Sequence, residues 1–306
     1  MAESQPSPAP PPGHRVLFVF GREHHLGDLV AGTTTIRAYR VLHHPSRVAV
    51  LAPDRAYSRI LERDPDIDDL LYAGDAELSD PRLKHGLSLP PADVVLDLSA
   101  RSVLWLLHHR GPLSRRLGLL HTALLGTRGR IMAEAAGVPW PVDDRPVIAL
   151  RAEDRGVAAQ IPRPYVVLAP YVGRFHNRLM QALWQALKAW PMDRWQRLAA
   201  LLRTDGYTVV TLGAGGEEAI PGTVPVIGRP IAEAAGVVER AAALITVESG
   251  LWYLACALGV PFVVVPYWPP RHADWIPAAA PPHRLLRRST ATPAAVVAAV
   301  QQIAAK

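Results

Sequence analysis

The stretch from Ala243 to Pro266 reads ALITVESGLWYLACALGVPFVVVP, and it decides the fold. Its apolar run at 244–247 is typical of a buried parallel strand, and a second such run begins at Phe262. The residues from 251 to 258 fit a short helix, which Gly259 would end. Strand, polar turn, helix and strand make one βαβ unit, so the sequence predicts an α/β fold with parallel sheets.

The polar turn inside this unit is the first candidate binding site. Glu248-Ser249-Gly250 separates the first strand from the helix, and open α/β sheets bind ligands at the carboxyl ends of their strands. The amides at the start of the helix favour an anionic group such as a phosphate. A unit that only builds the core would show the same pattern, so these residues alone leave both interpretations open.

The alternation of strands and helices extends over most of the chain. With 306 residues, of which 49% are hydrophobic, the default is two domains of roughly 150 residues. The expected strands cover residues 15–20, 47–52, 94–98, 165–169, 207–212, 224–227, 244–247 and 262–265, with a further short strand near 70–72. The expected helices cover residues 28–44, 57–62, 102–109, 179–189, 193–203, 231–242, 251–258 and 293–305.

Proline-rich segments divide this pattern. Residues 1–13 predict a disordered leader, and the prolines and charges of 139–164 predict a linker region. We therefore expect a first domain at 14–158 and a second at 159–306, with the final helix as a candidate to pack back on the first domain.

Composition excludes several classes of protein. The single cysteine, Cys256, excludes an internal disulfide, and no cluster of residues has the spacing of zinc ligands. The longest uncharged run, 249–270, contains a Gly-Val-Pro break and predicts no transmembrane helix. The net charge of +6 suits an anionic partner, but no basic helix interleaved with aromatic residues indicates nucleic acid. We expect a cytoplasmic protein.

Five short motifs follow one another along the chain. They are Leu26-Gly27-Asp28, Asp93 to Leu98 with Arg101-Ser102, Lys188 to Pro191, Gly213 to Glu217, and Ser249-Gly250 with Gly259-Val260-Pro261. In these motifs the chain resembles the heptosyltransferase family of bacterial glycosyltransferases, glycosyltransferase family 9. The resemblance implies two Rossmann-like domains facing a central cleft, the GT-B fold.

The activity implied by the resemblance is sugar transfer. A heptose or related sugar would move, with inversion and without a metal, from a nucleotide diphosphate to a bacterial glycan or glycolipid such as lipopolysaccharide. No cofactor is implied. Peripheral contact with the anionic inner membrane is a further expectation. Two alternatives remain: a non-catalytic relative that binds nucleotide sugars, and an epimerase on the same fold.

The resemblance also implies a donor side. It would comprise Lys188, Glu217, Glu248, Ser249, Gly250 and Tyr253. Lys188 would contact the donor phosphate and Glu217 the ribose, with Glu218 as an adjacent competitor. Where the family has Asp-Thr-Gly followed three positions later by His, this chain has Glu248-Ser249-Gly250 and Tyr253, so the donor sugar is left open. A solvated lysine and a packing tyrosine are the structural alternatives for Lys188 and Tyr253.

The acceptor side would comprise Gly27, His25 and Arg101, with Asp28 as the catalytic base. Asp28 also stands where a residue would cap the first helix or lie in its first turn. The aspartates at 64–68 fit a solvated loop better than a metal site, and no metal is expected.

Overall fold

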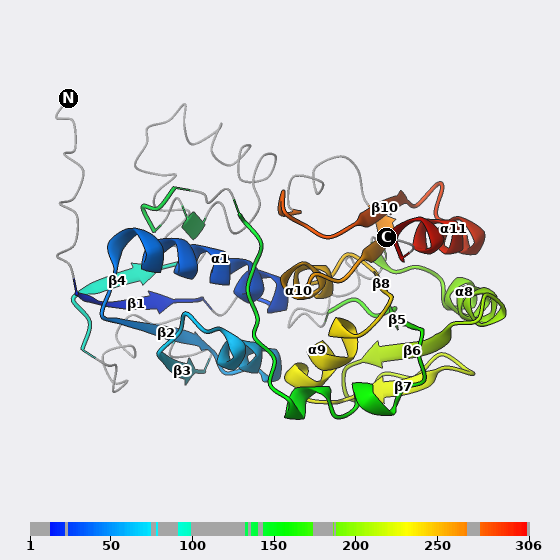
Figure 1. The fold of residues 1–306 in the computed structure, drawn as a ribbon, viewed down its shortest axis with the longest axis horizontal. Coiled ribbons are helices and arrows are strands. Elements are labelled where there is room, and N and C mark those ends of the chain that lie inside the picture. Colours follow the sequence, from blue (N-terminus) through cyan, green and yellow to red (C-terminus); the bar gives the residue numbers. More distant parts are fainter. Residues whose placement is uncertain are drawn as a thin grey trace.

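Two parallel β-sheets organise the chain and lie side by side in the computed structural model (Figure 1). The structure describes residues 13–21, 24–74, 78, 91–98, 132–133, 136–139, 143–173, 186, 188–267 and 276–304. Four expected features lie wholly or largely outside the described residues: the leader at 1–13 except its last residue, the helix at 102–109, most of the helix at 179–189, and Arg101.

The first sheet has the strand order β3-β2-β1-β4. Its strands are β1 (Arg15–Val19), β2 (Arg47–Pro53), β3 (Asp69–Ala73) and β4 (Val94–Asp97), and its helical elements are α1 (Leu26–His43) and the 3-10 helix η1 (Ala56–Arg63). Along β1, Val16 and Phe18 belong to one apolar cluster, while Leu17 and Val19 belong to another. Both faces of this sheet are therefore covered, which explains why its strands read as continuous apolar runs.

The second sheet has the order β10-β9-β8-β5-β6-β7, again with parallel neighbours throughout. Its strands are β5 (Tyr165–Ala169), β6 (Thr208–Gly213), β7 (Val224–Ile227), β8 (Ala243–Thr246), β9 (Phe262–Tyr267) and β10 (His283–Arg287). Its helices are α8 (Met192–Thr204), α9 (Ile231–Glu239), α10 (Leu251–Leu258) and α11 (Pro293–Ala304). The predicted α/β fold with parallel sheets is confirmed.

The βαβ unit quoted from the sequence is β8-α10-β9. Gly259 follows α10 with a φ of 72°, the left-handed conformation that glycine adopts readily. Two features differ from what the sequence indicated. Strand β10 was not predicted, because HRLLR carries three basic side chains in five residues. Among the described residues the final helix α11 packs mainly against α8 and strands β8 to β10 and not against the first domain, because its buried side chains join the core of the second sheet.

A strand-less segment at 143–156 runs across the boundary between the two sheets (Figure 1). Arg37 of α1 donates to the backbone carbonyls of Asp143 and Arg145, at 2.9 and 3.2 Å. The buried carboxylate of Asp144 accepts from the backbone N–H groups of Ala278 and Ala279, at 3.0 and 3.2 Å. The segment thereby joins α1 to the chain that follows β9.

Two neighbouring residues of this segment form ion pairs, one with each domain. Asp154 forms a bidentate pair with Arg63 of η1, at 2.7 and 2.8 Å, while Arg155 pairs with Glu239 of α9, at 2.5 and 2.6 Å. The Arg63 guanidinium lowers the pKa of Asp154. A methyl group on Gly236 of α9 would lie 2.0 Å from the Asp154 carbonyl oxygen, so glycine lets this short helix, η2 (Glu153–Arg155), pack directly on α9.

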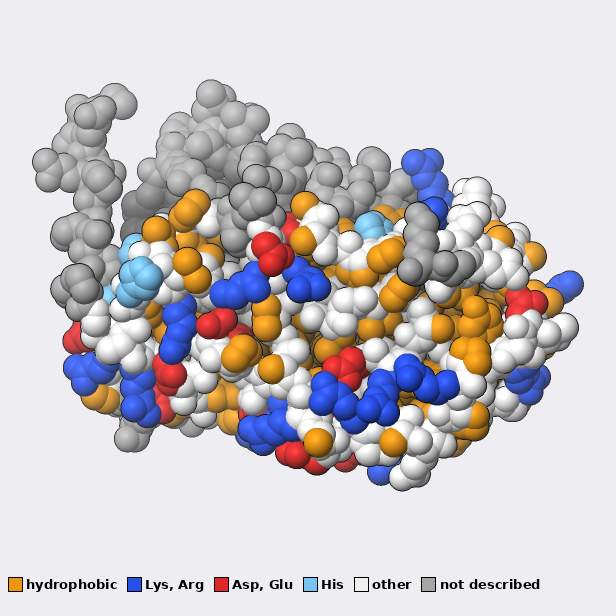
Figure 2. All heavy atoms as spheres, viewed as in Figure 1, with side chains coloured by type: hydrophobic (Ala, Val, Ile, Leu, Met, Phe, Trp, Pro, Cys, Tyr) orange, Lys and Arg blue, Asp and Glu red, His pale blue; other side chains and the backbone are white. Residues whose placement is uncertain are grey.

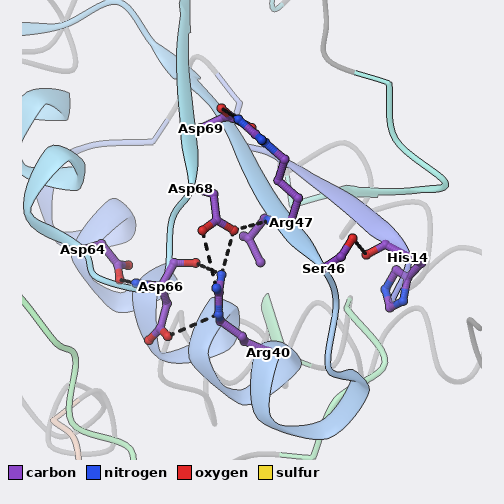
Figure 3. A network of polar contacts seen from close by, with 9 residues as sticks. His14, Arg40, Ser46, Arg47, Asp64, Asp66, Asp68 and Asp69 are labelled. Carbon is purple, nitrogen blue, oxygen red and sulfur yellow. Dashed lines mark hydrogen bonds and ion pairs between the residues drawn. The ribbon is translucent and has the colours of Figure 1, made fainter. Parts of the chain in front are cut away.

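The aspartate-rich loop at 64–69 is an ion-pair network (Figure 3). Arg40 of α1 donates to a carboxylate oxygen of Asp68 at 2.9 Å and lies 3.9 Å from one of Asp66. Arg47 pairs in the same way with Asp69. Among the described residues no group of three or more His, Cys, Asp or Glu could hold a metal ion.

Asp64 differs from its neighbours because it is 6% exposed. One of its carboxylate oxygens accepts from the Asp66 N–H at 2.9 Å, and the other has no hydrogen-bond partner among the described residues. Burial raises the pKa of Asp64 to about 7, against the opposing effect of the Asp66 hydrogen bond. The folded protein therefore favours the neutral acid.

This raised pKa predicts a pH-dependent stability. Below about pH 4 the buried Asp64 costs the folded protein no stability. Between about pH 4 and 7 the stability falls, because the unfolded chain releases this proton while the folded protein retains it. We expect the free energy of unfolding of Asp64→Asn to match that of the wild type at about pH 4 and to exceed it at pH 8 by on the order of a few kcal/mol. Chemical unfolding at both pH values measures this difference. Asp54→Asn, an exposed carboxylate before η1, is the control, and a difference that does not grow with pH would contradict the assignment.

The exposed charges of the visible face are mixed in sign (Figure 2). Several arginines of the described residues pair with nearby carboxylates: Arg40 with Asp68, Arg59 with Asp54, and Arg155 with Glu239. The exposed pair of Arg59 with Asp54 adds little stability, but all three pairs offset part of the positive charge of the surface. None of the helices in the described part of the chain is both long and apolar enough to cross a membrane.

Candidate active site

The first turns of α1 and α10 meet where the two sheets face each other. A methyl group on Gly250 would lie 2.4 Å from the Gly27 nitrogen and 3.0 Å from the Cβ of Leu26. A methyl group on Gly27 would lie 3.1 Å from the ring of Tyr253. Only glycine at both positions permits this approach. Two candidate site residues distant in sequence, Gly27 and Gly250, are therefore in direct contact.

Asp28 lies in the first turn of α1, next to this contact. The helix begins at Leu26, two residues earlier than expected, and Asp28 is its third residue. Its carboxylate, only 2% exposed, accepts from the backbone N–H of His25 at 2.8 Å. A carboxylate in the first turn is also stabilised by the helix dipole. Asp28 thus stabilises the helix start, and it does so at the domain boundary.

The two histidines before Asp28 differ in their surroundings. His24 is buried, its Nδ1 accepts from the Gly21 N–H at 2.9 Å, and its ring meets Phe20 edge-on. His25 is half-buried, with its ring centroid 6.2 Å from that of Tyr57. His24 is therefore a structural residue of the loop after β1, while His25 stays a predicted acceptor contact.

Lys188 and Glu248 form an ion pair. The Lys188 Nζ lies 3.0 Å from a carboxylate oxygen of Glu248, and their side chains are 18% and 7% exposed. Glu248 lies two residues beyond the end of β8 and precedes Ser249. Lys188 is therefore not a solvated lysine, and the structure brings together two residues expected on the donor side. A cation lies against the turn that leads into α10.

The Ser249 hydroxyl is engaged within its own turn. It lies 3.0 Å from the Thr246 hydroxyl and accepts from the Leu251 N–H at 3.4 Å. The backbone N–H groups of the first turn of α10 have no partner within the helix. They are the groups that could meet an anion here.

Glu217 also lies at the carboxyl ends of the strands of the second sheet. It follows β6, and β5 separates β6 from β8, so the two turns are roughly 10 Å apart at the usual strand spacing. Its carboxylate accepts from the Ala214 N–H at 2.6 Å. The structure places Glu217 at the predicted edge but does not bring it against Ser249 and Gly250.

Tyr253 packs between the domains. It is 4% exposed, its ring lies 4.2 Å from that of Trp252, and Gly27 lies against it. This is the packing alternative for Tyr253, and its expected contact with the donor stays a prediction.

Burial raises the pKa of the nearby buried Cys256 thiol to about 12, which makes it unreactive.

Two residues of the site region were missed in the sequence. Asp144 joins the domains through Ala278 and Ala279, and Arg288 bonds carbonyls beside Lys188. Each contact spans about a hundred residues or more of sequence. No local pattern marks such partners, so only the fold shows them.

Comparison with known proteins identifies the second half of the chain. Residues 150–279 match the family model of glycosyltransferase family 9 (heptosyltransferase). These residues are a glycosyltransferase family 9 domain. The family 9 domain contains β5 to β9, and so includes Lys188, Glu217 and the turn at 248–250. No curated protein matches the sequence.

Solved structures resemble both halves of the chain, beyond the family 9 domain. A glycosyl transferase family 9 protein from Veillonella parvula has a TM-score of 0.70 at 16% identity, over 96% of this chain and 98% of that one. The ADP-heptose LPS heptosyltransferase II of E. coli gives 0.68 at 18%, over 94% and 98%. The E. coli heptosyltransferase WaaC with ADP gives 0.60 at 15%, over 94% and 97%. The fold is therefore GT-B, as the resemblance implied.

Proposed function

We propose that this protein transfers a heptose or related sugar from a nucleoside diphosphate to a bacterial glycan or glycolipid acceptor. The observation that carries the proposal is the contact between Gly27 and Gly250, because it brings the first turn of α1 against that of α10. A candidate base on one domain and a candidate phosphate site on the other thereby share one boundary. ADP and ADP-heptose, which the structures of the relatives contain, are the first donors to test.

The donor would lie along the carboxyl edge of the second sheet. Its diphosphate would meet the first-turn amides of α10 and the ammonium of Lys188, and its ribose would lie toward Glu217. The spacing between the β6 and β8 turns, roughly 10 Å, suits a nucleoside diphosphate that spans them. Glu248 would keep the Lys188 ammonium directed at this edge.

Transfer needs a base for the acceptor hydroxyl and a stabilised leaving group. Asp28 would accept the proton of the attacking hydroxyl, with Gly27, His25 and Arg101 on the acceptor side. The attack would break the bond from the anomeric carbon to the phosphate oxygen and invert the anomeric centre. Lys188 and the helix-start amides would stabilise the departing diphosphate in place of a metal ion. The acceptor would be reached from the cytoplasm, with the basic excess favouring contact with an anionic membrane.

Lys188→Ala should weaken the binding of ADP by about 10- to 100-fold, the size of one hydrogen bond to a charged group. Isothermal titration calorimetry measures this change. Lys188→Arg should recover part of the affinity, since the charge returns. Lys188→Ala leaves the buried Glu248 carboxylate without its lysine. The matched control for folding is therefore the double variant Lys188→Ala/Glu248→Gln, in which this charge is removed as well. Unchanged ADP affinity in both alanine variants would remove Lys188 from the donor site.

A second candidate function, binding of nucleotide sugars without transfer, has one observation in its favour. Tyr253, where the family has a histidine, is buried against Gly27. A binder would take up the donor and release no nucleoside diphosphate when acceptor is added. A thermal-shift screen of nucleotide sugars would find the donor in either case, and turnover would then separate the two functions.

A further inference from the structure

Lys188 lies in a short piece of backbone that a distant arginine holds. Ala186 and Lys188 are helical, and the helix ends before Ala189. Nη2 of Arg288 donates to the carbonyl oxygen of Ala186 at 3.0 Å and to that of Ala189 at 2.9 Å. These two carbonyls flank Lys188 on both sides along the chain.

The chemistry of a helix end explains this contact. The last carbonyls of a helix have no partner within it, and they carry the negative end of the helix dipole. A guanidinium offers several N–H groups in one plane together with a full positive charge. One nitrogen of Arg288 can therefore join two carbonyls and fix the backbone between them.

The chain beyond Lys188 is anchored as well. Trp190 is 4% exposed and meets Trp195 of α8 edge-on, with ring centroids 5.1 Å apart. Both belong to the core on one face of the second sheet. On the side-chain end, Glu248 contacts the Lys188 ammonium at 3.0 Å. Backbone and side chain of Lys188 are thus both held by groups from other parts of the domain.

We propose that Arg288 is a positioning residue for donor binding, which acts by holding the backbone of Lys188 so that its ammonium faces the diphosphate. This rests on the proposed function, because it assumes that Lys188 contacts the donor. Arg288 itself lies just beyond β10, at the opposite edge of the sheet from β7. Its effect on the nucleotide passes through Lys188.

The test is a double-mutant cycle read out as ADP affinity by calorimetry. Arg288→Gln should weaken ADP binding by about fivefold, in the range of couplings between contacting residues. The control is Arg287→Gln, because Arg287 is also exposed and its side chain makes no hydrogen bond to any described residue. That variant should bind ADP like the wild type. Thermal unfolding midpoints should be the same for both variants.

The decisive arm uses the Lys188→Ala background. There Arg288→Gln should cause no further loss, since the group it positions is gone. Arg288→Lys in the wild-type background should recover part of the affinity, because it keeps a donor and a charge at the helix end.

Three results would overturn the proposal, and they can be told apart. An equal loss in both backgrounds would mean that Arg288 contacts the nucleotide itself. A loss for Lys188→Ala with none for Arg288→Gln would remove Arg288 and leave the proposed function intact. No loss for Lys188→Ala would remove the donor lysine, and the positioning role would fall with it.

Discussion

Asp28→Asn is expected to lower sugar transfer by about 100-fold or more, the range that general-base catalysis contributes. Asparagine has nearly the same size as aspartate and cannot accept a proton at neutral pH. The change leaves the first turn of α1, and its contact with α10, in place. A steady-state assay of transfer with a matched donor and acceptor measures the effect.

Two controls separate catalysis from helix capping. The asparagine oxygen can still accept from the His25 N–H, which the Asp28 carboxylate does at 2.8 Å, so the free energy of unfolding should fall by no more than about 1 kcal/mol. Donor affinity should barely change, because Asp28 belongs to the first domain. Transfer by Asp28→Asn at close to the wild-type rate would show that the residue only stabilises the helix.

Gly250→Ala should also reduce transfer by about 100-fold, for a geometric reason. Its methyl group would lie 2.4 Å from the Gly27 nitrogen, so the first turns of α1 and α10 must separate. A displacement on the order of 1 Å between reacting groups costs about that factor. Gly27→Ala should have a smaller effect, because its nearest contact would be 3.0 Å.

Gly156→Ala is the matched control for this prediction. It also lies between the domains and has a helical backbone, but its methyl group would meet only the Glu153 carbonyl oxygen, at 3.4 Å. We expect Gly156→Ala to transfer sugar like the wild type. If Gly250→Ala were equally active, the contact between the two helix starts would have no part in the reaction.

Much of the fold could be predicted because its signals are local. The apolar runs, the polar turn and Gly259 determine β8, α10 and β9 within 25 residues, and Thr292 caps α11 as expected, accepting from the Ala295 N–H at 3.1 Å. Strand β10 lacks such a signal, since three of its five side chains are basic and both of its arginines are exposed. The placement of α11 depends on which apolar core its buried side chains join, and the helical pattern alone does not determine this.

The candidate site was predictable as separate residues and not as an arrangement. Lys188 and Glu248 were each predicted as donor-side residues. Their ion pair was not predicted, because the two residues are 60 positions apart in the sequence. The contact of Gly27 with Gly250 likewise joins two domains. Such pairings depend on how the sheets face each other, and that is set by a continuous apolar core shared by both domains.

The measurement that tests the central claim most directly is the release of nucleoside diphosphate with and without acceptor. It uses the nucleotide sugar that gives the largest thermal shift, a panel of glycan and glycolipid acceptors, and the wild type beside Asp28→Asn. The account predicts release by the wild type only when an acceptor is present, and loss of that release in Asp28→Asn. Release that is independent of every acceptor, or that is undiminished in Asp28→Asn, would contradict it.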